Sequence, residues 1–493
     1  MKEYIRINPN DTVAVALRDL EAGFLAENVV LAEKIKSGHK FALARIPKGK
    51  PPVKFGFPIG TAAREISPGE WVHTHNLKSA LGGAREYEYK RYAPPQAVKR
   101  EPPGGIFYGY RRFGGKVGIR NEIWIIPTVG CINAIGLEIA NRFRKILPNG
   151  VDGITAFAHP YGCSQSGCDH ETTRAALCGL IRHPNAGGVL VMGLGCENNL
   201  LGELITELGP VDSDRVKFIQ CQDHCDEIEA ALPLVGELIE RAKDDVREAF
   251  DISKLVVGLK CGGSDGFSGI TANPLLGRFT DALTDSGGTA ILTEVPEIFG
   301  AEQILMDRAA DREVFDKTVK LINGFKDYFA SHGQPPGENP SPGNKDGGIT
   351  NLEEKSLGCV QKGGEAVVTG VLNYGETAAK AGLNILESPG NDLVASAALA
   401  ISGAQLILFT TGRGTPFGSA VPTVKISTNS QLAKKKAHWI DFDAGPLVDG
   451  AGMDEMAKDF YEYVLSVASG ETRAKSESLD KSGFAIFKNG VTL

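Results

Sequence analysis

The feature that most constrains this chain is a repeated alternation of short apolar runs with amphipathic helical stretches, which begins near residue 106. The run NAGGVLVMGLG (185–195) is apolar and β-branched, ends in glycines, and is followed by the helical stretch NLLGELITELG. A second series starts near residue 254 and includes KLVVGLKCGG, TAILTEVP, QLILFTTGRG and TVKISTNS. Strands that alternate with helices form parallel sheets with right-handed crossovers. The sequence therefore predicts an α/β fold from this point on.

The first part of the chain has a different pattern. Residues 41–76, FALARIPKGKPPVKFGFPIGTAAREISPGEWVHTHN, alternate short apolar runs with Pro/Gly turns and hold no helical period. APPQAVKREPPGG (93–105) has the prolines and charges of a linker. Because 493 residues exceed what one core usually serves, we expect a small β domain over 1–92, the linker, and two α/β parts over 106–250 and 251–493.

Composition excludes several classes of protein. The formal net charge of −7 and the lack of a Lys/Arg-rich tract argue against a nucleic-acid surface. No apolar run reaches the roughly 18 residues of a membrane span, and the start, MKEYIRINPNDTVAVAL, lacks the apolar centre of a signal peptide. The nine cysteines form no CxxC pair, which argues against a disulfide framework and a closed zinc site. We expect a cytoplasmic protein with reduced thiols and no membrane partner.

Two histidines stand out in EWVHTHN (70–76). His73 and His75 are two residues apart at the predicted end of a strand. On a strand, residues i and i+2 point to the same face, so that both imidazoles can approach one metal ion. A polar edge of the small β domain explains the same spacing, and the pattern alone leaves both interpretations open.

Polar residues also gather where the later apolar runs end. In open α/β sheets, ligands bind outside the carboxyl ends of the strands. If these turns share one rim, they form a candidate active site, although each residue could also be an ordinary turn residue or helix cap. The turns are GLGCENN (193–199), KCGGSDG (260–266), TEVPEIFGAEQ (293–303), TTGRGTPFG (410–418) and DFDAG (441–445).

Nucleotide binding is disfavoured, because GLGCENN lacks the third glycine of a dinucleotide-binding turn and the chain has no GxxxxGK[ST] motif. The absence of GxSxG weakens a serine-hydrolase interpretation. Cys163 and Cys168, with His159 and His170 close in sequence, could hold iron or zinc, or could be small residues in a buried turn. An iron–sulfur cluster drawing on Cys163, Cys196, Cys261 and Cys359 also stays open.

A series of motifs covers the whole chain in a fixed order: VHTHN, GKVGIRNEIWIIPTVGC, YGCSQ, GLGCENN, CGGSDGFSGITANPLLGRF, TEVPEIFGAEQ, ENPSPGNKDGGITNLEEKSLGC, PGND, TTGRGTPFG, HWIDFDAG and AIFKNGVTL. Through these motifs the chain resembles the altronate/galactarate dehydratase family over essentially all 493 residues. The resemblance implies a β-clip (SAF-like) domain at the N-terminus, a middle domain used for dimerisation, and a Rossmann-like C-terminal catalytic domain without a nucleotide.

The resemblance further implies a hydro-lyase that dehydrates D-altronate to 2-dehydro-3-deoxy-D-gluconate in hexuronate catabolism. It implies a divalent metal cofactor, Fe2+ or Mn2+, a small sugar acid as the partner, and a homodimer. Galactarate dehydratase and sulfolactate sulfo-lyase activity are the alternatives within the family. A sugar-binding scaffold and a thiol redox protein are the alternatives outside it, and the lack of CxxC weakens the second.

For this reaction a base removes the proton at C2, the hydroxyl at C3 leaves, and a metal can hold the charge that develops on the carboxylate. We expect the metal ligands to include His73 and His75, brought over the rim by the β-clip domain as a lid. Glu294, Glu297 and Cys261 are the candidates for the rest of the metal shell.

Arg413 is the expected partner of the substrate carboxylate, because glycines on either side let a ligand approach and a guanidinium binds a carboxylate bidentately. Lys345 is the second candidate for this role. The candidates for the general base are His170 and Lys345. The other expected substrate contacts are Asn198, Ser264 and Asp265.

Overall fold

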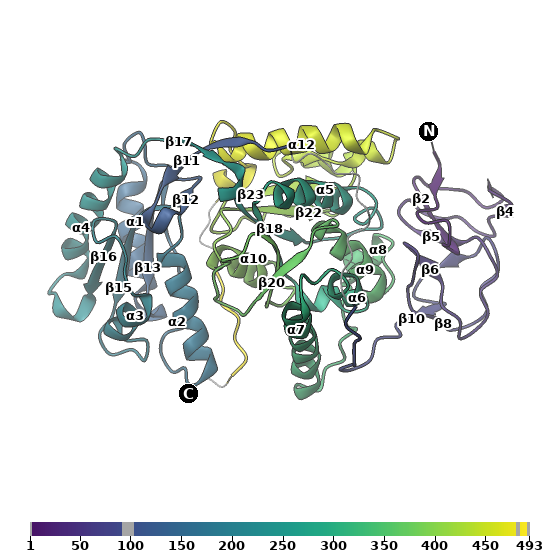
Figure 1. The fold of residues 1–493 in the computed structure, drawn as a ribbon, viewed down its shortest axis with the longest axis horizontal. Coiled ribbons are helices and arrows are strands. Elements are labelled where there is room, and N and C mark those ends of the chain that lie inside the picture. The colour runs from purple at the N-terminus through teal and green to yellow at the C-terminus, as the bar shows by residue number, and fades with distance from the viewer. Residues whose placement is uncertain (1, 91–102, 480–483, 491–493) are drawn as a thin grey trace.

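A computed structural model describes residues 2–90, 103–479 and 484–490. Three parts follow one another along the chain (Figure 1). The C-terminal part lies in the centre of that view, with the middle part on one side and the N-terminal part on the other. Most of the predicted linker, 93–105, falls outside the described residues.

The N-terminal part consists of very short antiparallel strands, because Pro and Gly turns interrupt the chain every few residues. Four strands form one sheet in the order β1-β2-β5-β9, over a core that includes Ala14, Ile35 and Phe41. The prediction of a small β-rich region is confirmed. The strands are β1 (Tyr4–Ile5), β2 (Val13–Ala16), β3 (Leu25–Ala26), β4 (Val29–Val30), β5 (Lys40–Ala42), β6 (Val53–Lys54), β7 (Phe57–Pro58), β8 (Thr61–Ala62), β9 (Trp71–Val72) and β10 (Leu77–Lys78).

The middle part is a four-stranded parallel sheet with helices on both faces. Its strand order is β14-β13-β15-β16. Side chains alternate along β13: Ile123 and Ile125 pack against α1 and α4, whereas Trp124 and Ile126 face α2 and α3. The elements are β13 (Glu122–Pro127), α1 (Asn133–Arg144), β14 (Gly153–Ala156), α2 (Cys168–Ile181), β15 (Ala186–Gly193), α3 (Leu201–Leu208), β16 (Val216–Gln220) and α4 (Glu227–Ala242).

A three-stranded antiparallel sheet lies between the middle and C-terminal parts. Its order is β12-β11-β17, and β11 packs against α12 of the C-terminal part (Figure 1). The two parts also share a hydrophobic core, since α2 packs on α10 with Leu177 and Leu399 in one cluster. The strands are β11 (Ile106–Arg111), β12 (Val117–Gly118) and β17 (Glu248–Asp251).

The C-terminal part is built on a seven-stranded parallel sheet in the order β20-β21-β19-β18-β22-β23-β24. This sheet confirms the predicted α/β fold class. Leu406 and Leu408 of β22 face α5 and α12, while Ile407 and Phe409 face α10. The strands are β18 (Val256–Cys261), β19 (Thr289–Leu292), β20 (Val368–Leu372), β21 (Gly382–Leu386), β22 (Leu406–Thr411), β23 (Thr423–Ser427) and β24 (Phe442–Asp443).

The sheet order reverses at β18, which continues to β19 on one side and pairs with β22 on the other. A reversal of this kind leaves a crevice at the carboxyl ends of the two strands, where ligands bind in open α/β sheets. The helices of this part are α5 (Ala272–Asp285), α6 (Glu302–Met306), α7 (Arg312–Ser331), α8 (Pro342–Asp346), α9 (Leu352–Cys359), α10 (Asp392–Ile401), α11 (Ser430–Lys435) and α12 (Met453–Ala468).

The N-terminal part is attached to the segment that carries α8 and α9. The buried carboxylate of Glu354 on α9 accepts hydrogen bonds from Lys40 (2.7 Å) and Lys54 (2.8 Å). His39 bonds the backbone oxygen of Asp346 at 3.2 Å. Among the residues that the structure describes, no helix has both the length and the apolar character to cross a bilayer.

Candidate functional site

A buried group of two thiols and one carboxylate lies at the end of the central strand β18. Cys261 is the last residue of β18, Glu297 lies in the 3-10 turn Val295–Ile298, and Cys359 ends α9. The two sulfur atoms are 3.3 Å apart, and Glu297 Oε2 is 3.5 Å from Cys261 Sγ and 3.4 Å from Cys359 Sγ. We call Cys261, Glu297 and Cys359 the thiol–carboxylate cluster.

The turn that brings Glu297 to this place is strained. Glu294 has a left-handed backbone with φ 68° and ψ 53°, a conformation that costs a residue other than glycine about 1–3 kcal/mol. Its buried carboxylate bonds Lys260, accepts from Lys362 at 2.8 Å and accepts from the Cys261 backbone N–H at 3.0 Å. Glu294 therefore serves as an anchor for two lysines and does not join the thiol–carboxylate cluster.

Lysines surround the cluster and set its charge. Lys355 donates to Glu297 Oε1 at 2.8 Å and to Asn339 Oδ1 at 3.0 Å. Burial opposes ionisation of Glu297, yet Lys355, Lys260 and Lys362 together lower the pKa of this carboxyl to about 2. Glu297 is thus ionised throughout the neutral range.

The two cysteines share a hydrogen bond that makes them unequal. The bond from Cys359 lowers the pKa of Cys261 despite burial. The same bond, together with burial, raises the pKa of Cys359 well above that of an ordinary thiol. Of the two thiols, Cys261 is therefore the one that ionises more readily.

A second feature of this rim is a cavity of about 590 Å³ around Arg413, which follows β22. This volume is in the range of small-molecule sites. The arginine side chain is exposed, and the structure gives it no hydrogen-bond or ion-pair partner within the described residues. Leu17 and Ser37 of the N-terminal part also line the cavity, so two parts of the chain contribute to its wall.

Ser264 and Asp265 lie between this cavity and the cluster. Asp265 lines the Arg413 cavity and also a narrow gap of about 10 Å³ that reaches Cys359, which is room for about one water molecule. The buried hydroxyl of Ser264 lines the gap and has no hydrogen-bond partner within the described part of the chain. Asp265 itself is held by Thr428 and Asn429, and its burial raises its pKa. An unsatisfied hydroxyl beside a gap is a place where a polar ligand can bind.

The thiol–carboxylate cluster has the donor atoms of a metal site. The three ligand atoms lie within 4.8 Å of one another, and they form the one such group of His, Cys, Asp and Glu side chains that the described residues contain. Two sulfur ligands and one carboxylate suit Fe2+ better than Mn2+, because thiolates favour softer metals. The residues therefore fit a divalent metal, and of the five predicted ligands Cys261 and Glu297 belong to this group.

The structure places His73 and His75 elsewhere. β9 ends at Val72, so both histidines lie in the following turn, where the alternation of strand side chains does not apply. His73 is buried, and its Nδ1 is 3.0 Å from Thr350 Oγ1. His75 is exposed, and its ring lies against Trp71. Burial, with the nearby Lys40, lowers the pKa of His73 to about 3, so His73 is neutral at the boundary with the C-terminal part.

Two further candidates lie in the middle part of the chain. Asn198 follows β15 and accepts from the Ser164 backbone N–H at 2.7 Å, while His170 on α2 contacts Arg174 at 3.2 Å. The expectation that all five polar turns share one rim is therefore wrong. GLGCENN ends a strand of the middle sheet, whereas the other four turns end strands of the C-terminal sheet. Parallel strands share one carboxyl edge only within a sheet, so the prediction required that all five strands belong to the same sheet.

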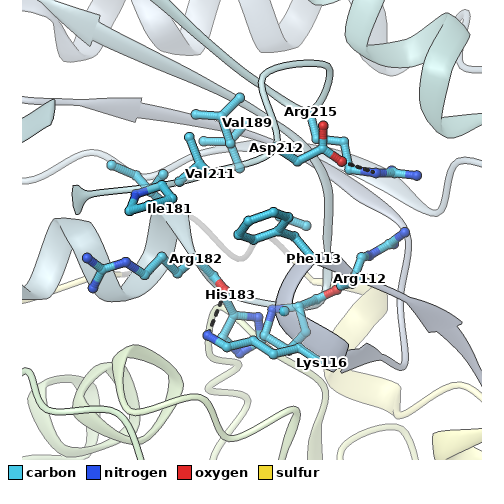
Figure 2. A pocket seen from close by; sticks show the side chains of 15 residues that line it. Arg112, Phe113, Lys116, Ile181, Arg182, His183, Val189, Val211, Asp212 and Arg215 are labelled. Carbon is cyan, nitrogen blue, oxygen red and sulfur yellow. Dashed lines mark hydrogen bonds and ion pairs between the residues drawn. The ribbon is translucent and has the colours of Figure 1, made fainter.

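Lys345 lies on the short helix α8. Its neighbour Asp346 lines the Arg413 cavity. Another cavity, of about 250 Å³, lies in the middle part and contains none of the predicted residues (Figure 2). Two of its arginines, Arg112 and Arg215, are bound to Asp245. These two cations are therefore paired, and the wall of the cavity is largely apolar.

Sequence reasoning missed the partner thiol and the lysines of the site. From the sequence, Cys359 is considered only as a possible ligand of an iron–sulfur cluster, and no role is assigned to Lys260, Lys355 or Lys362. Lys355 and Cys359 are four residues apart on α9, a spacing that puts two side chains on one helix face. That spacing was the available signal.

Comparisons with known proteins agree with this arrangement. Residues 2–80 match a family model of the altronate/galactarate dehydratase SAF domain, residues 109–243 match the second domain of D-galactarate dehydratase/altronate hydrolase, and residues 252–492 match the C-terminal domain of D-galactarate/altronate dehydratase.

Three curated proteins resemble the chain along its length. Altronate dehydratases of Escherichia coli (strain K12) and Bacillus subtilis (strain 168) are 51% and 52% identical over 100% of both chains. Galactarate dehydratase (L-threo-forming) of Escherichia coli (strain K12) is 33% identical over 96% of this chain and 94% of its own. The chain therefore belongs to the altronate/galactarate dehydratase family and is a hydro-lyase.

Proposed function

We propose that the protein dehydrates D-altronate to 2-dehydro-3-deoxy-D-gluconate, as a step of hexuronate catabolism. The observation that carries this proposal is the full-length identity of 51–52% to two altronate dehydratases, against 33% to a galactarate dehydratase. The open Arg413 cavity beside a buried, charged cluster supports it, because a sugar acid needs a cation for its carboxylate and a polar site for its hydroxyls.

We propose that Fe2+ is the cofactor and that Cys261, Cys359 and Glu297 hold it. When bound, such an ion supplies Lewis-acid stabilisation of the charge that develops on the substrate carboxylate and hydroxyl oxygens. Glu297 contributes an ionised carboxylate, and Cys261 contributes the thiolate that Cys359 stabilises. The Cys359 proton must leave for both sulfurs to become ligands, so loading should release a proton.

The side chains around the cluster then have separate tasks. Arg413, exposed in the cavity and without a protein partner in the described residues, binds the substrate carboxylate through two parallel hydrogen bonds. Lys355 is buried, but Glu297 and the two cysteines raise its pKa, so it stays charged and can stabilise an oxyanion. The free hydroxyl of Ser264 can donate to a substrate oxygen.

Removal of the C2 proton requires a base beside the cavity. Lys345 is our candidate, because it directly precedes Asp346, which lines the cavity, and because its side chain makes no hydrogen bond or ion pair with the described residues. His170 is the weaker candidate, because it lies on the middle part and its ring contacts Arg174. The base takes the C2 proton, and in its protonated form it can return a proton to the C3 hydroxyl, which then leaves as water. The resulting enol rearranges to the 2-keto acid.

The proposal is tested by an anaerobic assay of metal-stripped protein. Fe2+ or Mn2+ is added back, and D-altronate, galactarate and sulfolactate are assayed side by side. We expect Fe2+-dependent formation of the 2-keto-3-deoxy acid from altronate, and loss of activity in Cys359→Ser. Ser356→Ala, one helical turn before Cys359 on α9 and with a hydroxyl that bonds nothing in the described structure, is the matched control. Product from galactarate alone, or equal activity without metal, would overturn the proposal.

A further inference from the structure

The exposed cysteines of this chain are confined to one part of it. Five of the nine cysteines are exposed, and all five lie between residues 131 and 225. Free cysteine is ordinarily among the most buried residue types, because it behaves as a small hydrophobic side chain. The thiols of the middle part therefore need an explanation other than packing.

Three of these thiols follow three neighbouring strands. Cys131 comes after β13, Cys163 after β14 and Cys196 after β15, and β13 lies between the other two strands in the sheet. Because the strands are parallel, their carboxyl ends meet at one edge. A glycine precedes each of the three cysteines. We call Cys131, Cys163 and Cys196 the rim cysteines.

Hydrogen bonds tie the three loops together next to the cysteines. The Gly130 backbone N–H donates to Tyr161 O at 2.9 Å, which joins the first loop to the second. The Asn199 backbone N–H donates to Gly162 O at 3.0 Å, which joins the third loop to the second. Thr128 Oγ1 donates to Glu197 Oε1 at 2.7 Å, which joins the first loop to the third.

The glycines make this close approach possible. A Cβ on Gly162 would lie 2.1 Å from Thr128 O, and a Cβ on Gly130 would lie 2.8 Å from His159 O. Ser164, next to Cys163, has a left-handed backbone with φ 55°. Strain in a residue other than glycine is retained where the surrounding structure requires it, and it often marks a functional site. The backbone is thus arranged to hold the three loops in one place.

We propose that the rim cysteines bind an iron–sulfur cluster of the [4Fe–4S] type, with its fourth iron bound by a ligand other than cysteine. Three cysteine thiolates from adjoining loops are the kind of ligand that holds such a cluster. The rim cysteines are presented in this way, because their loops follow neighbouring parallel strands and are joined by hydrogen bonds. This site is separate from the proposed catalytic site and does not depend on the proposed function.

The surroundings of the rim suit such a cluster. Gln222 Nε2 donates to Cys196 Sγ at 3.5 Å, and Ser164 Oγ donates to Cys163 Sγ at 3.9 Å. Hydrogen bonds to the ligand sulfurs are one of the means by which proteins adjust a cluster's potential. The buried carboxylate of Glu197 holds the Cys196 turn, because it accepts from the backbone N–H groups of Leu194 (2.9 Å) and Gly195 (2.6 Å) as well as from Thr128 Oγ1.

The test is anaerobic reconstitution of the full-length protein with iron, sulfide and a thiol reductant, followed by desalting. We expect about four irons and four acid-labile sulfides per chain at the rim, a visible sulfur-to-iron charge-transfer band and an electron paramagnetic resonance signal on reduction. Sulfide content separates this site from iron held by the thiol–carboxylate cluster, which needs none. Cys131→Ser, Cys163→Ser and Cys196→Ser should each lose the band and the sulfide.

Cys225→Ser is the matched control, because Cys225 is exposed in the same part but follows β16, outside the three tied loops. It should keep the full cluster. Circular dichroism should show every variant folded, and since the substituted thiols are exposed, unfolding is not the expected cause of a lost band. Iron without sulfide in the wild type, a full band in Cys163→Ser, or a lost band in Cys225→Ser would each overturn the assignment.

Discussion

Replacing Glu354 by glutamine should weaken the attachment of the N-terminal part to the rest of the chain. The carboxylate of Glu354 on α9 is fully buried, and it binds Lys40 and Lys54, which are buried as well. Burial opposes ionisation of this group, but the two ammonium groups hold the pKa of Glu354 well below its usual value. Glutamine keeps the size of the side chain and removes the charge that compensates two cations.

The magnitude follows from the burial of the two lysines. Removing one partner of a buried ion pair costs about 3–5 kcal/mol. Lys40 limits this cost, because burial lowers its pKa to about 8 even with Glu354 present. In the Glu354→Gln variant, Lys40 can lose its proton and so avoid being an unpaired buried cation. Removing a proton at pH 7 from a group whose pKa is about 8 costs only about 1.4 kcal/mol. We therefore expect the free energy of unfolding to fall by about 3–5 kcal/mol, and not by twice that amount.

The effect should depend on pH in a defined direction. A lysine whose pKa is lowered by folding takes up a proton on unfolding, so its penalty is largest at low pH and decreases as the pH rises. Above pH 8, Lys40 is largely neutral in the wild type too. The deficit of the Glu354→Gln variant should therefore shrink by about 1 kcal/mol between pH 7 and pH 9.

Urea unfolding followed by tryptophan fluorescence measures this loss, because Trp71 stacks on His73 close to the same boundary. Glu353→Gln is the matched control: its carboxylate accepts from Ser79 Oγ and the Ala80 backbone N–H, and from no lysine in the described structure. We expect this control to lose no more than about 1 kcal/mol. Equal urea midpoints for the two variants would refute the electrostatic explanation.

Three other changes have defined outcomes. Arg413→Lys should raise the KM for altronate about tenfold while the fold is unchanged, because lysine lacks the bidentate guanidinium; steady-state kinetics measures this, and an unchanged KM would remove Arg413 from the substrate site. Burial lowers the pKa of His183 to about 3, so below pH 6.5 the unfolded chain binds a proton that the folded chain does not. The free energy of unfolding should therefore fall by about 1.4 kcal/mol per pH unit down to about pH 3. In the His183→Asn variant, the urea midpoint should depend less on pH. Gly266→Ala should lower the melting temperature, since the added Cβ would lie 1.9 Å from Gly38 O. Gly324→Ala on α7, where the added Cβ meets no atom within 4 Å, should raise the free energy of unfolding by up to about 1 kcal/mol. Equal changes in the melting temperatures of the two variants would contradict the packing argument.

Local sequence patterns predicted much of the fold. The apolar runs KLVVGLKCGG and QLILFTTGRG become β18 and β22, because strand and helix periodicities are properties of short segments. The same logic identified Cys261 and Arg413, since both follow directly from where a strand ends. The identity of neighbouring strands is not a local property, and the turn 193–199 was therefore assigned to the wrong sheet.

The site depended more on contacts distant in sequence. Cys359 meets Cys261 from 98 residues away, and Lys362 meets Glu294 from 68 residues away. No periodic pattern in the sequence predicts either contact. His73 and His75 illustrate the converse, because a two-residue spacing implies a shared face only on a strand, and the strand ends before them.

By itself, the sequence determined the α/β class, the small β-rich beginning, the strand ends that carry Cys261 and Arg413, and, through its motifs, the family. The tertiary structure alone decided that two separate sheets divide the polar turns, that Cys359 and three lysines complete the cluster around Cys261 and Glu297, and that Lys40 and Lys54 of the N-terminal part are bound to Glu354. The physical reason is the separation along the sequence over which each effect acts. Periodicity and turn chemistry act between near neighbours in sequence, whereas burial, pKa and ligand geometry depend on which distant side chains pack together.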